Sequence, residues 1–172
     1  MFGVPVEGFS QKSKEAAAEG IVLLKNEGGM LPLTQKDKIS VFGRPQIEYY
    51  RSGTGSGGAV NVEYATNILD GFENSNLNID ETLVEKYKNW LKDHPFDNGG
   101  GGWACEPWFQ KDMPIDEAFA KEQAAKTNKA LYIIGRTAGE DKDNAIWQGS
   151  YILTDEEKEN LRNITKAFDN VC

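Results

Sequence analysis

The chain has 172 residues, of which 39% are hydrophobic and 27% are charged, as is typical of a folded globular protein rather than a disordered one. Its formal net charge of −8 argues against nucleic-acid binding, which depends on clustered Lys and Arg. No apolar run reaches the length of a membrane span, and the first residues lack the pattern of a signal peptide. We therefore expect no partner nucleic acid, no membrane association and a cytoplasmic location.

The N-terminal third predicts one helix and one strand. Small and apolar side chains at helical spacing over residues 10–25 predict a helix, with Ser10 or Ser13 as its N-cap. The apolar segment 30–33 is expected to pack that helix down. Residues 38–43 (KISVFG) form a β-branched run that ends in glycine, which is typical of a buried parallel strand. A long glycine-rich loop follows that strand, and loops of this length are usually functional.

The central part predicts two helices and then an insertion. Apolar spacing favours a helix over residues 64–73, and a second helix over 81–92 with Asp80 as its cap. From residue 93 to 113 the composition changes to four consecutive glycines, two prolines and several Trp and Phe residues. We interpret residues 93–113 as an insertion loop.

The remaining residues predict helix, strand and helix in the order that a parallel sheet requires. An alanine-rich helix is expected over 116–127, and a buried strand over 129–136 (KALYIIGR). Thr154 and Glu157 match a capping box for a helix that runs to about residue 168, and residues 170–172 begin another strand. These elements predict an α/β fold, a three-layer sandwich whose mostly parallel sheet is flanked by helices. Because the last strand is only begun, we expect residues 1–172 to be part of one such domain.

Two segments carry residues capable of chemistry, but their spacing alone leaves the role of each open. Residues 135–144 (GRTAGEDKDN) place ionisable side chains after a strand, where they form a general acid, a metal site or only a solvated loop, and by spacing alone the solvated loop is the more common explanation. Glycines at 53–58 suggest a phosphate-binding loop, although a close-packed turn is the more common explanation. The two cysteines, Cys105 and Cys172, have neither metal-ligand nor disulfide spacing, so we predict no metal and no cofactor.

Several stretches of the chain resemble glycoside hydrolase family 3, which contains many β-glucosidases and β-xylosidases. The segment AAAEGIVLLKN at 16–26, followed by LPL at 31–33, is similar to the family signature. The blocks KISVFG, GTGSGGAV, YIIGRTAGED and GSYILTDEE agree with it in the same order. The resemblance is to the α/β sandwich domain of the family and covers nearly the whole chain.

This resemblance implies a role for Glu140. Family members are retaining enzymes with an aspartate nucleophile on a separate barrel domain and a glutamate as acid/base. Gly139-Glu140-Asp141 resembles the acid/base loop of many bacterial members, so Glu140 is the expected acid/base. Asp141 and Asn144 depart from the pattern of that loop, which has a second glycine and an arginine at these positions.

The resemblance further implies that the chain is the acid/base part of a β-glucosidase that acts on β-linked oligosaccharides or glycosides. Arg136 and Asp143 are expected sugar-binding residues. Trp103 and Trp108 of the insertion are also candidates, since their rings either stack on sugars or hold the insertion against the core. The barrel domain of the same protein is the expected partner, so residues 1–172 alone should be inactive. The start of the chain near the signature suggests a bacterial member in which this domain precedes the barrel, or else a fragment of a normally ordered chain.

Two other interpretations and one further partner remain open at this point. The chain is alternatively a non-catalytic carbohydrate-binding module that uses Trp103 and Trp108, or a nucleotide-binding protein that uses the glycines at 53–58. A domain separated from its barrel would expose an apolar docking face, so a homodimer is also a possible assembly.

Overall fold

A computed structural model of the chain describes residues 6–51, 54–58 and 64–172, and its centre is a small parallel sheet. The strands are β1 (Lys38–Phe42), β2 (Asn78–Ile79) and β3 (Lys129–Tyr132), in the order β2-β1-β3. Both pairings of β1 are parallel. Val171 forms a further parallel bridge with Ala130 of β3, which agrees with the strand predicted to begin at 170–172.

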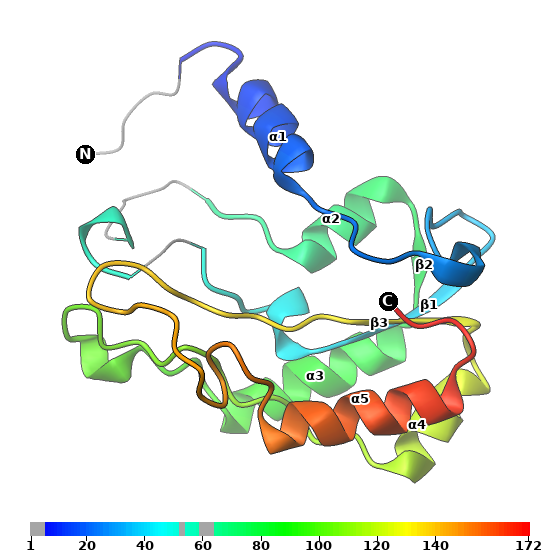
Figure 1. The fold of residues 1–172 in the computed structure, drawn as a ribbon. Coiled ribbons are helices and arrows are strands. Elements are labelled where there is room, and N and C mark those ends of the chain that lie inside the picture. Colours follow the sequence, from blue (N-terminus) through cyan, green and yellow to red (C-terminus); the bar gives the residue numbers. More distant parts are fainter. Residues whose placement is uncertain (1–5, 52–53, 59–63) are drawn as a thin grey trace.

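Helices cover both faces of this sheet, which confirms the predicted α/β sandwich. Three helices lie on one face, α3 (Glu81–Asp93), α4 (Glu117–Ala124) and α5 (Asp155–Ala167), whereas α2 (Ile68–Ser75) lies on the other (Figure 1). The main core lies under the first face, where Phe42 and Tyr132 of the strands meet Tyr87 of α3 and Ile164 of α5. Because β1 and β3 are parallel, with Phe42 opposite Tyr132, their carboxyl ends lie at the same edge of the sheet.

The predicted caps of α3 and α5 are confirmed. Asp80 accepts a hydrogen bond from the backbone N–H of Thr82 at 2.9 Å. Thr154 and Glu157 form the reciprocal capping box, with bonds of 3.1 and 2.8 Å. A cap bond satisfies a backbone N–H that has no partner within the helix, which is why short polar residues at these positions could be recognised from sequence.

The helix predicted over residues 10–25 is shorter and less packed than expected. The structure has α1 at Phe9–Gly20, preceded by Gly8 without a side-chain cap, so the expected caps Ser10 and Ser13 are wrong. The helix ends where low-propensity Gly20 meets two β-branched residues. No residue of α1 is buried, so the expected packing of the helix by residues 30–33 is also wrong.

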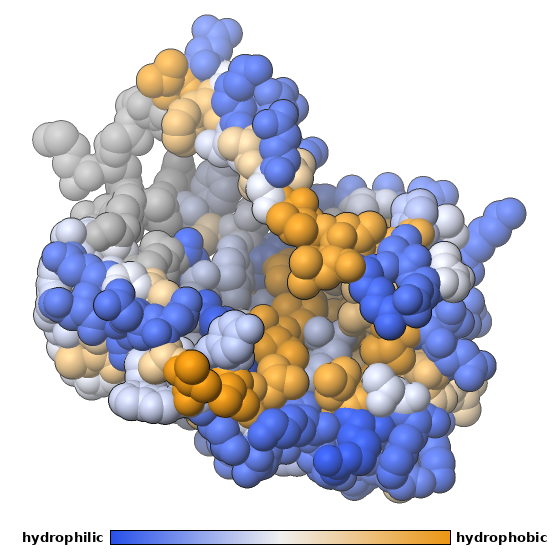
Figure 2. All heavy atoms as spheres, viewed as in Figure 1, coloured by the Kyte–Doolittle hydropathy of each residue, from blue (hydrophilic) through white to orange (hydrophobic). Residues whose placement is uncertain are grey.

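An exposed apolar strap follows α1. Its four residues, Ile21, Val22, Leu23 and Leu24, are 59–92% exposed, and Figure 2 shows apolar residues gathered at the foot of α1. Beyond the strap, the side chain of Asn26 bonds both backbone groups of Leu31, and Met30 is buried. Among residues 6–30, Met30 is thus the only buried one.

Three other elements differ in their bounds from the prediction. Helix α2 begins at Ile68 rather than at residue 64, because Asn67 forms a capping box with Asp70. Strand β3 ends at Tyr132, although the N–H of Ile133 still donates to the carbonyl of Phe42 before the chain leaves the sheet. Helix α4 spans only Glu117–Ala124.

In the parts of the chain that the structure describes, no helix is long and apolar enough to cross a membrane.

Candidate active site at the carboxyl ends of the strands

The loops that follow β1 and β3 meet at the carboxyl-end edge of the sheet. Thr54 and Gly139 form a parallel bridge, and the N–H of Thr54 donates to the carbonyl of Ala138 at 3.4 Å. Ligand sites of open parallel sheets lie at this edge, because the loops from neighbouring strands converge there. Gly53 and residues 59–63 of the glycine-rich segment lie outside the described residues.

Glu140 lies on the β3 loop, with its side chain exposed. Its carboxylate oxygen Oε2 accepts hydrogen bonds from the N–H and the hydroxyl of Ser56, at 3.1 and 3.2 Å. The hydroxyl of Thr54 donates to the backbone carbonyl of Glu140 at 3.0 Å. The carboxylate is thus exposed to solvent and also oriented by the loop that follows β1.

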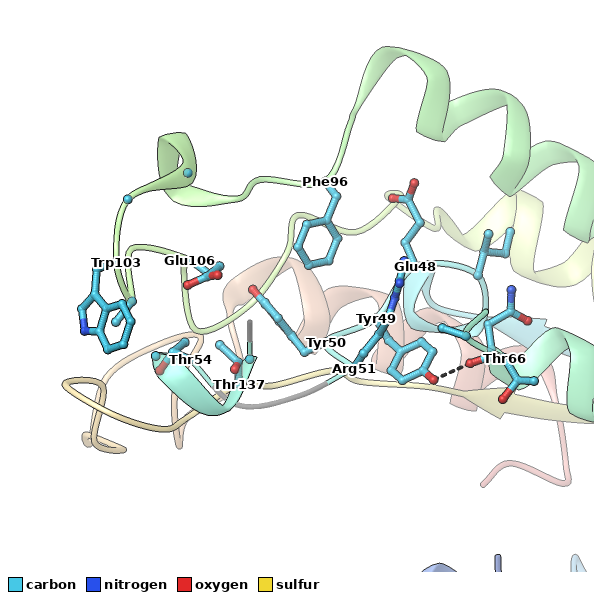
Figure 3. Close-up of a pocket in the computed structure, with 18 residues that line it drawn as sticks. Glu48, Tyr49, Tyr50, Arg51, Thr54, Thr66, Phe96, Trp103, Glu106 and Thr137 are labelled. Atoms are coloured by element: carbon cyan, nitrogen blue, oxygen red, sulfur yellow. Dashed lines mark hydrogen bonds between the residues drawn. The ribbon is translucent and has the colours of Figure 1, made fainter. Parts of the chain in front are cut away.

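A groove of about 680 Å³ opens beside this carboxylate. Gly55, which is in contact with Glu140, is one of the residues that line the groove. Figure 3 shows Tyr50 and Phe96 in the middle of the groove and Trp103 at one end. Tyr50 and Phe96 pack edge to face, with ring centroids 5.2 Å apart. The groove is also lined by charged and polar side chains, among them Glu48, Arg51 and Glu106. A groove of this size with aromatic rings and many polar groups is suited to a small polar ligand such as a sugar.

The insertion predicted at residues 93–113 forms one wall of this groove and has an ordered internal structure. Gln110 donates to the hydroxyl of Tyr50 and to the carbonyl of Asp97, both at 2.8 Å. Tyr50 in turn donates to the carbonyl of Pro107. These bonds connect the insertion to the β1 loop, so the wall is held in place by polar contacts as well as by packing.

The two tryptophans predicted to bind sugar lie in different surroundings. Trp103 lines the groove and is 58% exposed. Trp108 is half-buried against Trp147, with ring centroids 5.3 Å apart, and the ammonium of Lys142 lies 5.6 Å from its ring. Trp108 does not line the groove, and its ring contacts the Glu140 loop through Lys142.

Arg136, also predicted to bind sugar, is committed to contacts within the chain. Both of its terminal nitrogens donate to the carboxylate of Glu157 at 2.6 Å, and its Nε donates to the carbonyl of Ser150 at 2.9 Å. The side chains of Arg136 and Glu157 are mostly buried. A bidentate pair of this kind fixes the start of the Glu140 loop to the capping box of α5. Sugar binding by Arg136 stays a prediction.

Asp143 is exposed on the same loop, three residues after Glu140. Asp141 between them has a positive φ of 58°, which turns the chain tightly after Glu140. Within residues 6–51, 54–58 and 64–172, no cluster of three His, Cys, Asp or Glu side chains could hold a metal ion.

Sequence reasoning missed three side chains that shape this edge. Ser56 orients the Glu140 carboxylate, Tyr50 anchors the insertion, and buried Asp112 accepts bonds from the N–H groups of Arg44 and Met113. The only sequence signal for Ser56 was its place between glycines. No pattern pointed to Asp112, because its partners lie 68 residues away and next to it in the chain.

These features define a class of protein, namely a parallel α/β sandwich domain with an exposed carboxylate and an aromatic groove at the carboxyl-end edge of its sheet. Comparison with known proteins places it more narrowly. Residues 21–172 match the model of the "Glycosyl hydrolase family 3 C-terminal domain". The chain therefore belongs to that family.

Individual relatives agree with the family match. The chain is 45% identical over 163 residues to "Beta-glucosidase" of Ruminococcus albus and 30% identical over 160 residues to "Beta-glucosidase A" of Butyrivibrio fibrisolvens. These alignments cover 95% and 92% of this chain, but only 17% and 18% of the relatives. The chain thus corresponds in length to less than a fifth of either relative.

Solved structures confirm the fold. A beta-glucosidase from Paenibacillus barengoltzii has a TM-score of 0.94 at 56% identity, over 99% of this chain and 18% of that one. Beta-glucosidase 3B from Thermotoga neapolitana, solved with glycerol, has a TM-score of 0.80 at 32% identity, over 95% and 22%. The chain is therefore similar to a minor part of each of these enzymes.

Proposed function

We propose that this chain supplies the acid/base carboxylate, Glu140, of a retaining β-glucosidase whose nucleophile lies on a barrel domain outside residues 1–172. The observation that carries the proposal is the position of Glu140, exposed at the carboxyl-end edge of the sheet and next to the mouth of an aromatic groove. The similarity of the chain to parts of named β-glucosidases supports the same activity.

The proposed reaction has two steps, each with a proton transfer at Glu140. In the first, a nucleophilic carboxylate forms a bond to the anomeric carbon of the sugar as the bond to the leaving oxygen breaks. Glu140 gives its proton to that oxygen, which keeps the electron pair. In the second, Glu140 takes a proton from water, whose oxygen then displaces the nucleophile. The nucleophile of a retaining enzyme lies about 5–5.5 Å from the acid/base, so the partner domain has to cover the edge that carries Glu140.

We further propose that the groove receives the leaving group of a β-linked oligosaccharide or glycoside. Trp103 offers an exposed ring at one end of the groove, on which a sugar can stack. Asp143 would bind sugar hydroxyls beside Glu140. Because the chain carries one of the two carboxylates that the reaction needs, it should have no glycosidase activity by itself.

Replacement of Glu140 in the full-length protein tests the acid/base assignment. Glu140→Gln should lower kcat/KM for cellobiose and methyl β-glucoside by about 10²- to 10⁴-fold, because protonation of these poor leaving groups is lost. A 2,4-dinitrophenyl β-glucoside, which leaves without protonation, should lose much less in the first step. Azide should restore turnover of that substrate as glucosyl azide, because the anion needs no base.

Asp141→Asn is the matched control. Asp141 lies next to Glu140 on the same exposed loop, and asparagine tolerates its positive φ. This variant should keep the wild-type dependence on the leaving group. If Glu140→Gln affected all three substrates equally, or none of them, Glu140 would not be the acid/base.

A further inference from the structure

The loop that follows β1 and the loop that carries Glu140 are joined over three residues on each side. In addition to the parallel bridge between Thr54 and Gly139, the hydroxyl of Thr54 donates to the carbonyl of Glu140 at 3.0 Å. Two segments that lie 86 residues apart in the sequence are therefore in register at the point where Glu140 leaves the chain. The position of this glutamate depends on residues 54–56 as much as on its own loop.

Two glycines make this close approach possible. Gly55 has a φ of +87°, and a Cβ atom there would lie 2.5 Å from the Cβ and 2.6 Å from Oε2 of Glu140. Gly139 has a φ of +157°, and a Cβ atom there would lie 2.7 Å from the backbone nitrogen of Thr54. Any larger residue at either position would force the two loops apart. This packing accounts for the glycines at positions 55 and 139.

The two oxygens of the Glu140 carboxylate are in different situations. Oε2 accepts both the N–H and the hydroxyl of Ser56. Oε1 accepts no hydrogen bond from any residue that the structure describes. A carboxyl group with one oxygen held by two donors has a fixed plane, and its proton has to reside on the other oxygen.

We propose that Ser56 is the positioning residue of the acid/base, holding Oε2 so that Oε1 carries the proton toward the leaving oxygen. This inference rests on the proposed function, because it assigns a task to Ser56 only if Glu140 is the acid/base. The backbone N–H of Ser56 is present in every variant, so the side-chain hydroxyl supplies the part of the clamp that mutation can remove. The hydroxyl also distinguishes serine from other residues that would satisfy the turn.

The test uses the dependence of kcat/KM on the leaving group in the full-length protein. Ser56→Ala should lower kcat/KM for cellobiose and methyl β-glucoside by about 10- to 100-fold, as expected for a lost bond to the negative charge that develops on the carboxylate as its proton leaves. It should change kcat/KM for 2,4-dinitrophenyl β-glucoside by less than about 3-fold, because that substrate needs no proton. Ser56→Thr keeps a hydroxyl and should recover most of the loss. Ser75→Ala, which removes an exposed hydroxyl on α2, is the control and should behave as wild type.

Gly55→Ala provides a second check, since it separates the two loops while the hydroxyl of Ser56 is kept. It should give the same selective loss for the two poor leaving groups as Ser56→Ala. An equal loss on all three substrates in Ser56→Ala, or no loss on any of them, would overturn the proposed positioning role. Should Glu140→Gln retain wild-type turnover, the proposed function itself fails, whereas a silent Ser56→Ala beside an inactive Glu140→Gln removes only the role of Ser56.

Discussion

Arg136 and Glu140 follow the same strand and lie four residues apart, yet the structure uses them in opposite ways. Arg136 is directed into the molecule, where Glu157, Ser150 and the carbonyl of Gly135 accept hydrogen bonds from four of its five guanidinium N–H groups. Glu140 is exposed, and only one of its oxygens has a partner among the described residues. One charged segment of the sequence thus contains both a structural residue, Arg136, and the candidate catalytic residue, Glu140.

The largest expected effect on stability comes from the supporting side of this comparison. Arg136→Ala leaves the Glu157 carboxylate largely buried without its cation, and it should lower the free energy of unfolding by about 2–4 kcal/mol. The loss should appear as a lower urea midpoint of the full-length protein. Activity should fall as well, because the Glu140 loop loses its attachment to α5.

Arg162→Ala is the control for that change. Arg162 and Glu159 form an ion pair on the same helix, but both side chains are about half exposed. Exposed pairs contribute little, so this variant should change the free energy of unfolding by no more than about 0.5 kcal/mol. Equal effects of the two variants would show that the Arg136 pair has no special structural role.

Trp108 and Trp103 extend the same comparison to the insertion. Trp108→Ala removes the ring that packs against Trp147 and should lower the free energy of unfolding by about 2 kcal/mol. Trp103→Ala should leave unfolding unchanged, because the ring is mostly exposed, but should raise the KM for cellobiose by about 3- to 10-fold. Urea unfolding and steady-state kinetics of the two variants separate these roles. A destabilised Trp103→Ala with unchanged KM would reverse the assignment.

The sequence predicted those features of the fold that depend on near neighbours. The caps Asp80 and Thr154, the buried strand at residues 38–42 and the breaks caused by glycine in the insertion all arise from short-range chemistry. Arg136 and Trp108 could not be separated from Glu140 and Trp103 in this way, because their partners Glu157 and Trp147 are 21 and 39 residues further along the chain. The predicted helix also ran too far, to residue 25, because the apolar residues of the strap at 21–24 have helical spacing. In the structure the helix ends at Gly20, which is followed by β-branched residues.

Asp112, like Arg136, is a buried charged residue, and its replacement should have the smallest effect on the free energy of unfolding and the one that depends most on pH. Burial raises the pKa of Asp112 from its ordinary value of 3.8 to about 6, and repulsion by Glu156 acts in the same direction. The bonds that Asp112 accepts from the N–H groups of Arg44 and Met113 only partly offset the burial. The folded protein therefore binds this proton more tightly than the unfolded chain. The stabilisation is complete below pH 3.8 and is lost as the pH rises through about 6.

Asp112→Asn removes this titration while it keeps an oxygen that can accept both backbone bonds. At pH 7–8, the variant should be more stable than the wild type by about 1–2 kcal/mol, since the buried charge costs free energy there. The advantage should shrink as the pH is lowered toward 4, where the wild-type carboxyl is neutral in the folded state. Urea midpoints of the two proteins between pH 4 and 8 measure the difference. If the variant were more stable by the same amount at every pH, or less stable than the wild type at pH 8, the ionised Asp112 carboxylate would not destabilise the folded protein.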